Sequence, residues 1–114
     1  MKPRTILVIA IVCSCVITLG LPAVLDPFVR GDANGDLLVN LADPIFTLNY
    51  LFSGGPHPQC MDAADANTDH MIDIADPTYT LLFLFAGGPP PSYPFPQCQP
   101  ALEIVLGCDD PPCF

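Results

Sequence analysis

Basic residues are scarce in this sequence. Its 114 residues hold 3 Lys and Arg against 12 Asp and Glu. Lys2 and Arg4 stand at the very start, so the chain beyond residue 25 keeps Arg30 alone, one positive against twelve negative charges, or a net charge of −11. Nucleic acids and anionic membrane surfaces are therefore not expected as partners.

Histidine is scarce as well, and with it the usual means of acid–base catalysis. Of the two histidines, His57 lies in a proline-rich turn and His70 lies inside an acidic segment. No Ser–His–Asp or Cys–His signature accompanies either of them. The sequence therefore predicts a protein without enzyme activity.

The first 23 residues have the composition of a secretory signal peptide. A basic start is followed by an apolar run over residues 6–19 and by small residues at Gly20 and Ala23. Cleavage after one of these two residues would release an extracellular protein. The alternative is an uncleaved anchor, because residues 6–25 are about long enough to span a bilayer.

The chain beyond residue 23 is largely one unit written twice. At an offset of 33 residues, 32–56 aligns with 65–89, and 14 of the 25 positions are identical. Each copy runs from an acidic loop through Ala-Asp-Pro and an apolar segment to Gly-Gly-Pro, and closes on Pro-Gln-Cys. We therefore expect one domain over residues 24–98, made of repeats 28–60 and 61–98.

The apolar segments "IFTLNYLF" and "TYTLLFLF" are predicted helices. They begin near Pro44 and Pro77 and end at the Gly-Gly pairs, the usual placement of proline and glycine at helix ends. Asp43 and Asp76 are the expected N-caps. Since both segments are apolar nearly all round, we expect burial on more than one face. Strands are the alternative, because β-branched and aromatic residues abound. The predicted core residues are Phe46, Leu48, Leu51, Tyr79, Leu81 and Leu84.

The two acidic loops, "DANGDLLVNLAD" (loop 1, residues 32–43) and "DANTDHMIDIAD" (loop 2, residues 65–76), have the oxygen spacing of a calcium site. Ca²⁺ takes six to eight oxygens, and a twelve-residue loop supplies them from positions one, three, five, seven, nine and twelve. Mg²⁺ fits less well because it resists dehydration. Two solvated acidic turns are the alternative. In loop 1 the predicted ligands are Asp32, Asn34, Asp36, the Leu38 carbonyl, Asn40 and Asp43. In loop 2 they are Asp65, Asn67, Asp69, the Met71 carbonyl, Asp73 and Asp76.

Position six of such a loop is normally glycine, because the chain turns there with positive φ. Here it is Leu37 or His70, at a cost of roughly 1–2 kcal/mol each. Gly35, at position four, is expected to absorb part of the turn in loop 1. Val39 and Ile72, at position eight, are expected to join the loops through a short strand contact. Loop 2 carries four carboxylates against three, so we predict that it binds calcium more tightly.

The ligand spacing, the following helices and the 33-residue offset resemble the type I dockerins over about residues 31–88. The glycine-rich ends and cysteine-rich tail are similar to dockerin-like repeats of large secreted bacterial proteins. The resemblance implies a mainly α fold of tandem loop–helix calcium repeats (F-hands), each without the entering helix of an EF-hand. It also implies a docking function, in which the domain holds a protein to a scaffold, a cell surface or an extracellular assembly.

Dockerins bind cohesin domains through positions that are far more apolar in this chain than is usual in the family. The matching residues are Leu41, Ala42, Leu48, Asn49, Ile74, Ala75, Leu81 and Leu82. The expected partner is therefore a cohesin-like domain or another apolar surface, with a homodimer as an alternative. An accessory subunit of a polysaccharide-degrading system and a membrane-anchored surface protein are the other functions left open.

Four cysteines follow the predicted signal peptide and point to an oxidising compartment. Three pairings are available to Cys60, Cys98, Cys108 and Cys113. The parallel Pro-Gln-Cys ends predict Cys60–Cys98, which leaves Cys108–Cys113 to close a tight loop in the tail, residues 99–114. A zinc site is the rival reading, but these spacings match no common zinc pattern.

Overall fold

The computed structural model describes residues 25–113, which form a small, mainly helical domain with three helices and two disulfides. The predicted signal peptide lies outside the described residues. Within residues 25–113, no helix is long and apolar enough to cross a membrane. The elements in chain order are β1 (Pro27–Phe28), α2 (Ala42–Phe52), α3 (Met61–Ala64), α4 (Ala75–Phe85) and β2 (Gln99–Pro100).

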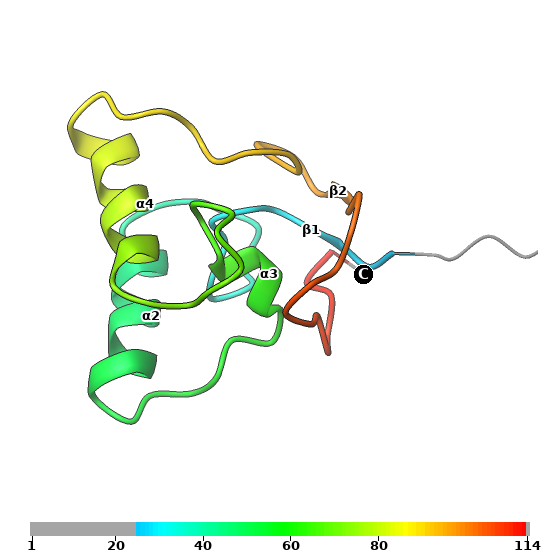
Figure 1. The fold of residues 1–114 in the computed structure, drawn as a ribbon, viewed down its shortest axis with the longest axis horizontal. Coiled ribbons are helices and arrows are strands. Elements are labelled where there is room, and N and C mark those ends of the chain that lie inside the picture. The colour runs from blue at the N-terminus through cyan, green and yellow to red at the C-terminus, as the bar shows by residue number, and fades with distance from the viewer. Residues whose placement is uncertain (1–24, 114) are drawn as a thin grey trace, which may run out of the picture.

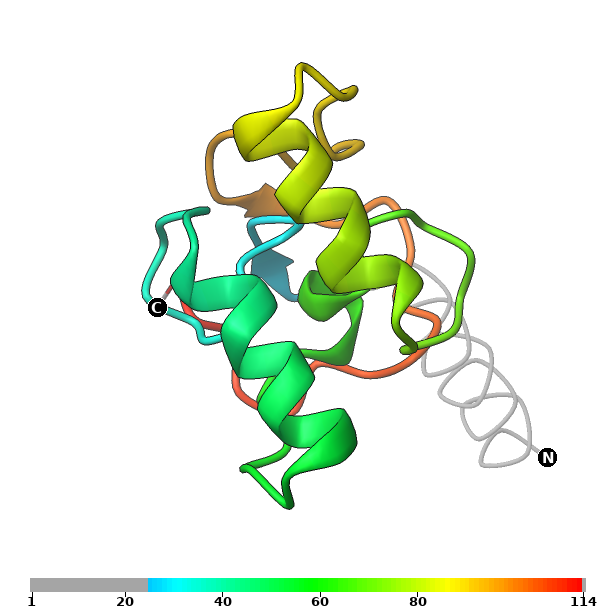
Figure 2. The ribbon, with the colours of Figure 1, turned by 90° about the vertical axis from the view of Figure 1, so that its left-hand side faces the viewer.

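The helices α2 and α4 pack side by side and run in opposite directions, as expected for two repeats related by a local twofold axis (Figure 1). Behind this layer lie α3, the C-terminal segment and the two-stranded sheet, in which Phe28 pairs with Gln99 (Figure 2). The single turn of α3 directly precedes loop 2. The predicted C-terminal tail, residues 99–114, thus supplies one of the two strands.

The starts of α2 and α4 differ from the prediction. Each helix begins two residues before the proline, and neither Asp43 nor Asp76 is an N-cap: both lie in the first turn and turn back toward their loops. The free N–H group of Ala42 instead donates to Asn40 Oδ1 at 2.9 Å. The corresponding bond in the second repeat also measures 2.9 Å. Position nine therefore caps the helix, because a loop of this length places its side chain over the first turn.

Both helices end as the glycine pairs predict. In α2, the N–H groups of Ser53 and Gly55 both donate to the Asn49 carbonyl at 2.9 Å, and Gly54 between them has φ +69°. A Cβ on Gly55 would lie 3.0 Å from the backbone of Asn49, so the following residue must also be glycine. Leu82 and the second Gly-Gly pair repeat this arrangement.

The residues predicted to form the core are not the ones that the structure buries most fully. All six residues named for it are only half-buried, and the fully buried cluster is built from Phe28, Cys60, Ala63, Ala101 and Cys108. The fully buried residues of both helices lie near their N-termini, and Phe52 and Phe85 are 68% and 69% exposed. The exposed residues of α4, which are Thr78, Leu82 and Phe85, form one stripe, and its other residues are buried or half-buried, in agreement with the predicted burial on more than one face.

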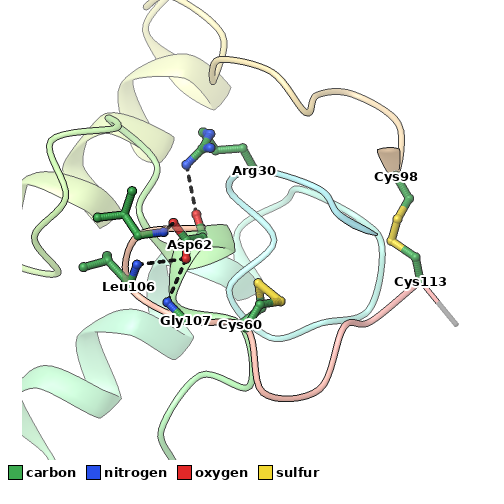
Figure 3. The surroundings of a disulfide bond; sticks show 9 residues. Arg30, Cys60, Asp62, Cys98, Leu106, Gly107 and Cys113 are labelled. Carbon is green, nitrogen blue, oxygen red and sulfur yellow. Dashed lines mark hydrogen bonds between the residues drawn. A yellow bond between two sulfur atoms is a disulfide. The ribbon is translucent and has the colours of Figure 1, made fainter. Parts of the chain in front are cut away.

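The predicted disulfide pairing was wrong as well, because the C-terminal segment returns alongside the start of α3. Met61 N donates to Gly107 O at 2.8 Å and Asp109 N to Gln59 O at 2.9 Å, which brings Cys60 opposite Cys108. The bonds are Cys60–Cys108 and Cys98–Cys113 (Figure 3). The second Pro-Gln-Cys leads into β2 rather than into another copy of α3. The two Pro-Gln-Cys segments therefore match in sequence but lie in different structural surroundings.

Candidate metal centres

Each acidic loop gathers three carboxylates around one point. In loop 1 an oxygen from each of Asp32, Asp36 and Asp43 lies within 4.8 Å of the others. In loop 2 the same holds for Asp65, Asp69 and Asp76. In both triads the first and last aspartates are buried and the middle one is exposed. Two Asp triads that could each hold a metal ion are thus present, as two calcium sites require.

The first aspartate of each loop organises the turn around itself. Asp32 Oδ1 accepts the N–H groups of Gly35 and Asp36 at 3.1 Å, and its Oδ2 accepts that of Leu37 at 3.0 Å. In loop 2, Asp65 accepts from Asp69 and His70 at 3.2 and 3.1 Å. These bonds fold the backbone over the carboxylate and fix its orientation.

The last aspartate closes the loop from the other side. Asp43 Oδ2 accepts Asn40 N at 2.8 Å, while its Oδ1 accepts Asn34 N at 3.4 Å. Asp76 makes the matching bonds to the backbone of Asp73 and Asn67 at 3.0 and 3.5 Å. The first turn of each helix therefore carries a carboxylate that accepts backbone N–H groups of the preceding loop.

Burial makes these carboxylates costly to ionise without a cation. Desolvation raises the pKa of Asp32 to about 7 and, in loop 2, raises the pKa of Asp76 to about 7. Desolvation also raises the pKa of Asp43 and of Asp65. Within residues 25–113 no Lys or Arg forms an ion pair with either triad. A divalent ion between the carboxylates would offset the desolvation and repulsion together.

The other predicted ligands fall into three groups. Nothing among the described residues donates a hydrogen bond to the carbonyl of Leu38 or Met71, so both oxygens are free for a metal. Asp73 stays outside the loop 2 triad, and the side chains of Asn40 and Asp73 both accept a backbone N–H group at the start of the following helix, which agrees with a role through water at position nine. The amides of Asn34 and Asn67 bond the neighbouring aspartate at the open side of the loop.

A hard cation fits this donor set. Every group offered is an oxygen, from carboxylates, amides and a backbone carbonyl, and no thiol or imidazole takes part. The imidazole of His70 lies 3.8 Å from Glu103 Oε1, and is thus turned toward the C-terminal segment. Calcium and magnesium share this preference for oxygen, and the irregular loop with many donors suits calcium better.

The backbone at positions four and six is left-handed in both loops. Leu37 has φ +70° and His70 has φ +67°, as their place at position six predicts. Gly35 takes part in the turn as predicted, since it is left-handed at φ +76°, and Thr68 matches it in loop 2 at φ +63°. The expected strand contact at position eight is absent: within residues 25–113 no backbone hydrogen bond joins Val39 to Ile72.

Sequence reasoning gave no role to Arg30 and did not single out Thr68. Arg30 is only 6% exposed and donates to three backbone carbonyls. The signal that could have found it is its isolation, since it is the one base beyond residue 25 and stands two residues before loop 1. Thr68 could have been found from its alignment with Gly35.

Comparisons with known proteins add no relative: no family model, no curated protein and no solved structure matches this chain.

Proposed function

We propose that this chain is a secreted, non-enzymatic calcium-binding module of the dockerin type, which docks a protein to an extracellular partner. One observation carries the proposal: an Asp triad whose first and last members are buried occurs twice, and in both copies the residue at position six donates its backbone N–H to the first aspartate. Acidic turns that are merely solvated have no need to bury carboxylates, and Asp32 and Asp65 are 1% and 0% exposed. The two disulfides agree with an oxidising, extracellular environment.

The outer face of α2 and α4 supports a docking role. The two helices contain no charged residue other than Asp43 and Asp76, which are buried. The exposed apolar side chains on or beside this face are Leu41, Ile45, Phe52, Ile74, Leu82 and Phe85. A partner for such a surface is itself apolar and uncharged at its centre, such as a cohesin-like domain.

Calcium titration by calorimetry tests the metal sites. We expect two Ca²⁺ per chain, and weaker binding of Mg²⁺ measured in the same way. Asp36→Ala and Asp69→Ala, which alter exposed members of the two triads, are each expected to leave one site. Asp110→Ala, an exposed aspartate outside the loops, is the matched control and should still bind two. Absence of calcium heat from the folded, oxidised protein contradicts the proposal.

Docking is tested by a pull-down from the secreted fraction with and without chelator. Leu41→Asp and Leu82→Asp place a charge on the exposed face without touching a triad, and we expect them to abolish capture. Leu102→Asp, on an 81% exposed residue away from the helices, is the matched control. Capture that survives both helix variants contradicts docking through this face, and a monomer–dimer change on dilution would identify a second copy as the partner.

A further inference from the structure

Arg30 joins the entrances of both loops. Its Nη1 donates to the carbonyl oxygen of Asp62 at 3.0 Å (Figure 3). The same Nη1 donates to Asp65 O at 3.1 Å, and Nε donates to Tyr93 O at 3.2 Å. The guanidinium also lies 5.2 Å from the centre of the Phe28 ring. These contacts hold a buried side chain in one position, and each partner oxygen belongs to the backbone.

The location of Arg30 relates it to both triads. In sequence it stands two residues before Asp32, the first ligand of loop 1. In space it holds the carbonyl of Asp65, the first ligand of loop 2. Beside it, Gly31 N donates to Ala63 O at 2.7 Å, so the two chain segments that enter the loops are bonded together. The loops are thus joined at their first residues rather than at position eight.

Asp62, which accepts a hydrogen bond from Arg30, is also held by the C-terminal segment. The Asp62 carboxylate accepts the backbone N–H groups of Val105, Leu106 and Gly107 at 3.2, 3.0 and 2.9 Å (Figure 3). Asp62 is thus held from two sides, through its carbonyl by Arg30 and through its carboxylate by the C-terminal segment. The carboxylate of Asp65 in turn holds the backbone of Asp69 and His70.

We propose that Arg30 is a positioning residue that couples the two metal loops, so that calcium in loop 1 raises the affinity of loop 2 for calcium, and the reverse. The inference rests on the proposed calcium binding. Coupling between two binding sites is reciprocal and commonly amounts to a factor of 5–150. A guanidinium is suited to it because its planar donors reach three fixed carbonyls at once, which a lysine ammonium cannot do with the same geometry.

The test is a four-protein cycle read by calorimetric calcium titration of loop 2: the unaltered protein, Asp36→Ala, Arg30→Lys, and both changes together. With Arg30 present, loss of the loop 1 site is expected to weaken calcium binding at loop 2 by about fivefold or more. With Arg30→Lys, the same loss is expected to change it by less than about twofold. The charge is retained in this variant, so an effect of charge alone would leave the coupling in place.

A second measurement keeps Arg30 intact in case the variant does not fold. In Asp69→Ala, where only loop 1 binds, the backbone NMR signals of Asp65 and Ala66 are expected to move together with those of loop 1 during the calcium titration. Loop 2 signals that stay fixed overturn the inference, as does a cycle in which Arg30→Lys keeps the full coupling. A protein that binds no calcium at all contradicts the proposed function instead, so the two failures are distinct.

Discussion

Loop 1 and loop 2 reach the same backbone shape with different residues. Position four is Gly35 in loop 1 and Thr68 in loop 2, yet their φ values are +76° and +63°. Glycine adopts this conformation freely, whereas a residue with a Cβ pays roughly 1–2 kcal/mol. The shape is therefore imposed by the bonds to the first aspartate and not by local preference. Loop 2 carries two strained residues where loop 1 carries one.

The loops also differ in which backbone N–H groups donate to the carboxylate of the first aspartate. Gly35 N donates to the Asp32 carboxylate, whereas Thr68 N donates to the backbone carbonyl of Asp65 at 3.4 Å. The hydroxyl of Thr68 is buried and has no hydrogen-bond partner among the described residues. Against this, loop 2 has the extra charge of Asp73 where loop 1 has Asn40. Loop 2 thus combines stronger attraction for a cation with a less relaxed backbone.

Removing the metal is expected to give the largest effect. A ligand at 100 times its Kd stabilises the folded state by about 2.7 kcal/mol per site. For a domain of this size, each kcal/mol shifts Tm by about 4–8 °C. We therefore expect chelator to lower Tm by more than about 10 °C, as measured by circular dichroism. In excess calcium, Asp69→Ala should lower Tm more than Asp36→Ala, because we predict that loop 2 binds calcium more tightly.

Equal losses from the two variants would contradict the ranking of the loops. An unchanged Tm on chelation in a calcium-loaded sample would contradict calcium binding itself. The control is Asp110→Ala, whose Tm should fall by the same amount as that of the unaltered protein when calcium is removed.

Exchange of the position-four residues is expected to give the next largest effect. Thr68→Gly removes the strain and the unpaired hydroxyl, and the two gains together exceed the freedom that glycine adds to the unfolded chain. The substitution should therefore stabilise the calcium-free protein by about 1–2 kcal/mol in urea unfolding. Gly35→Thr should destabilise it by about 1–2 kcal/mol through strain alone, because a Cβ there would lie 3.5 Å from Pro112 and would not clash. If both substitutions lower stability, Thr68 makes a contact whose stabilisation exceeds the strain of its positive φ.

Local sequence signals predicted the site better than they predicted the packing. Carboxylate spacing within twelve residues identified both triads, because a loop of fixed length and a following helix leave few conformations. The helix ends at Gly54 and Gly87 follow from the same local reasoning, since each has φ close to +70°. Left-handed Leu37 and His70 were predictable from their position alone.

Contacts between distant segments were not predictable from the repeat. Cys108 returns to α3 through bonds of Gly107 and Asp109 that have no counterpart in the other repeat. Phe28 is buried because β2 pairs with β1, and neither strand has a signal beyond two residues. An apolar composition on all sides also cannot say which stripe of each helix stays exposed.

Exchange of the charge at position nine tests whether the extra carboxylate makes loop 2 bind calcium more tightly. Asp73→Asn should weaken calcium binding at loop 2 by about fivefold, and Asn40→Asp should strengthen loop 1 by a similar factor, about 1 kcal/mol for one added charge near the ion. Each change is measured by calorimetry in a protein with the other site removed. Both side chains can still accept the N–H of the following helix, so the caps serve as their own control. Unchanged affinities would show that position nine has no electrostatic part in binding.

The smallest effect is expected at position six, where the loops are equally strained. Leu37→Gly and His70→Gly release a left-handed residue in each loop, but glycine also gains freedom in the unfolded chain, so the net stabilisation is about 0.5–1 kcal/mol. The contact of His70 with Glu103 joins side chains that are 48% and 71% exposed, and its loss should not be measurable. The two gains in urea unfolding should therefore agree within about 0.5 kcal/mol. A clearly smaller gain for His70→Gly would mean that the histidine stabilises loop 2 through the C-terminal segment, and the loops would then differ at position six as well.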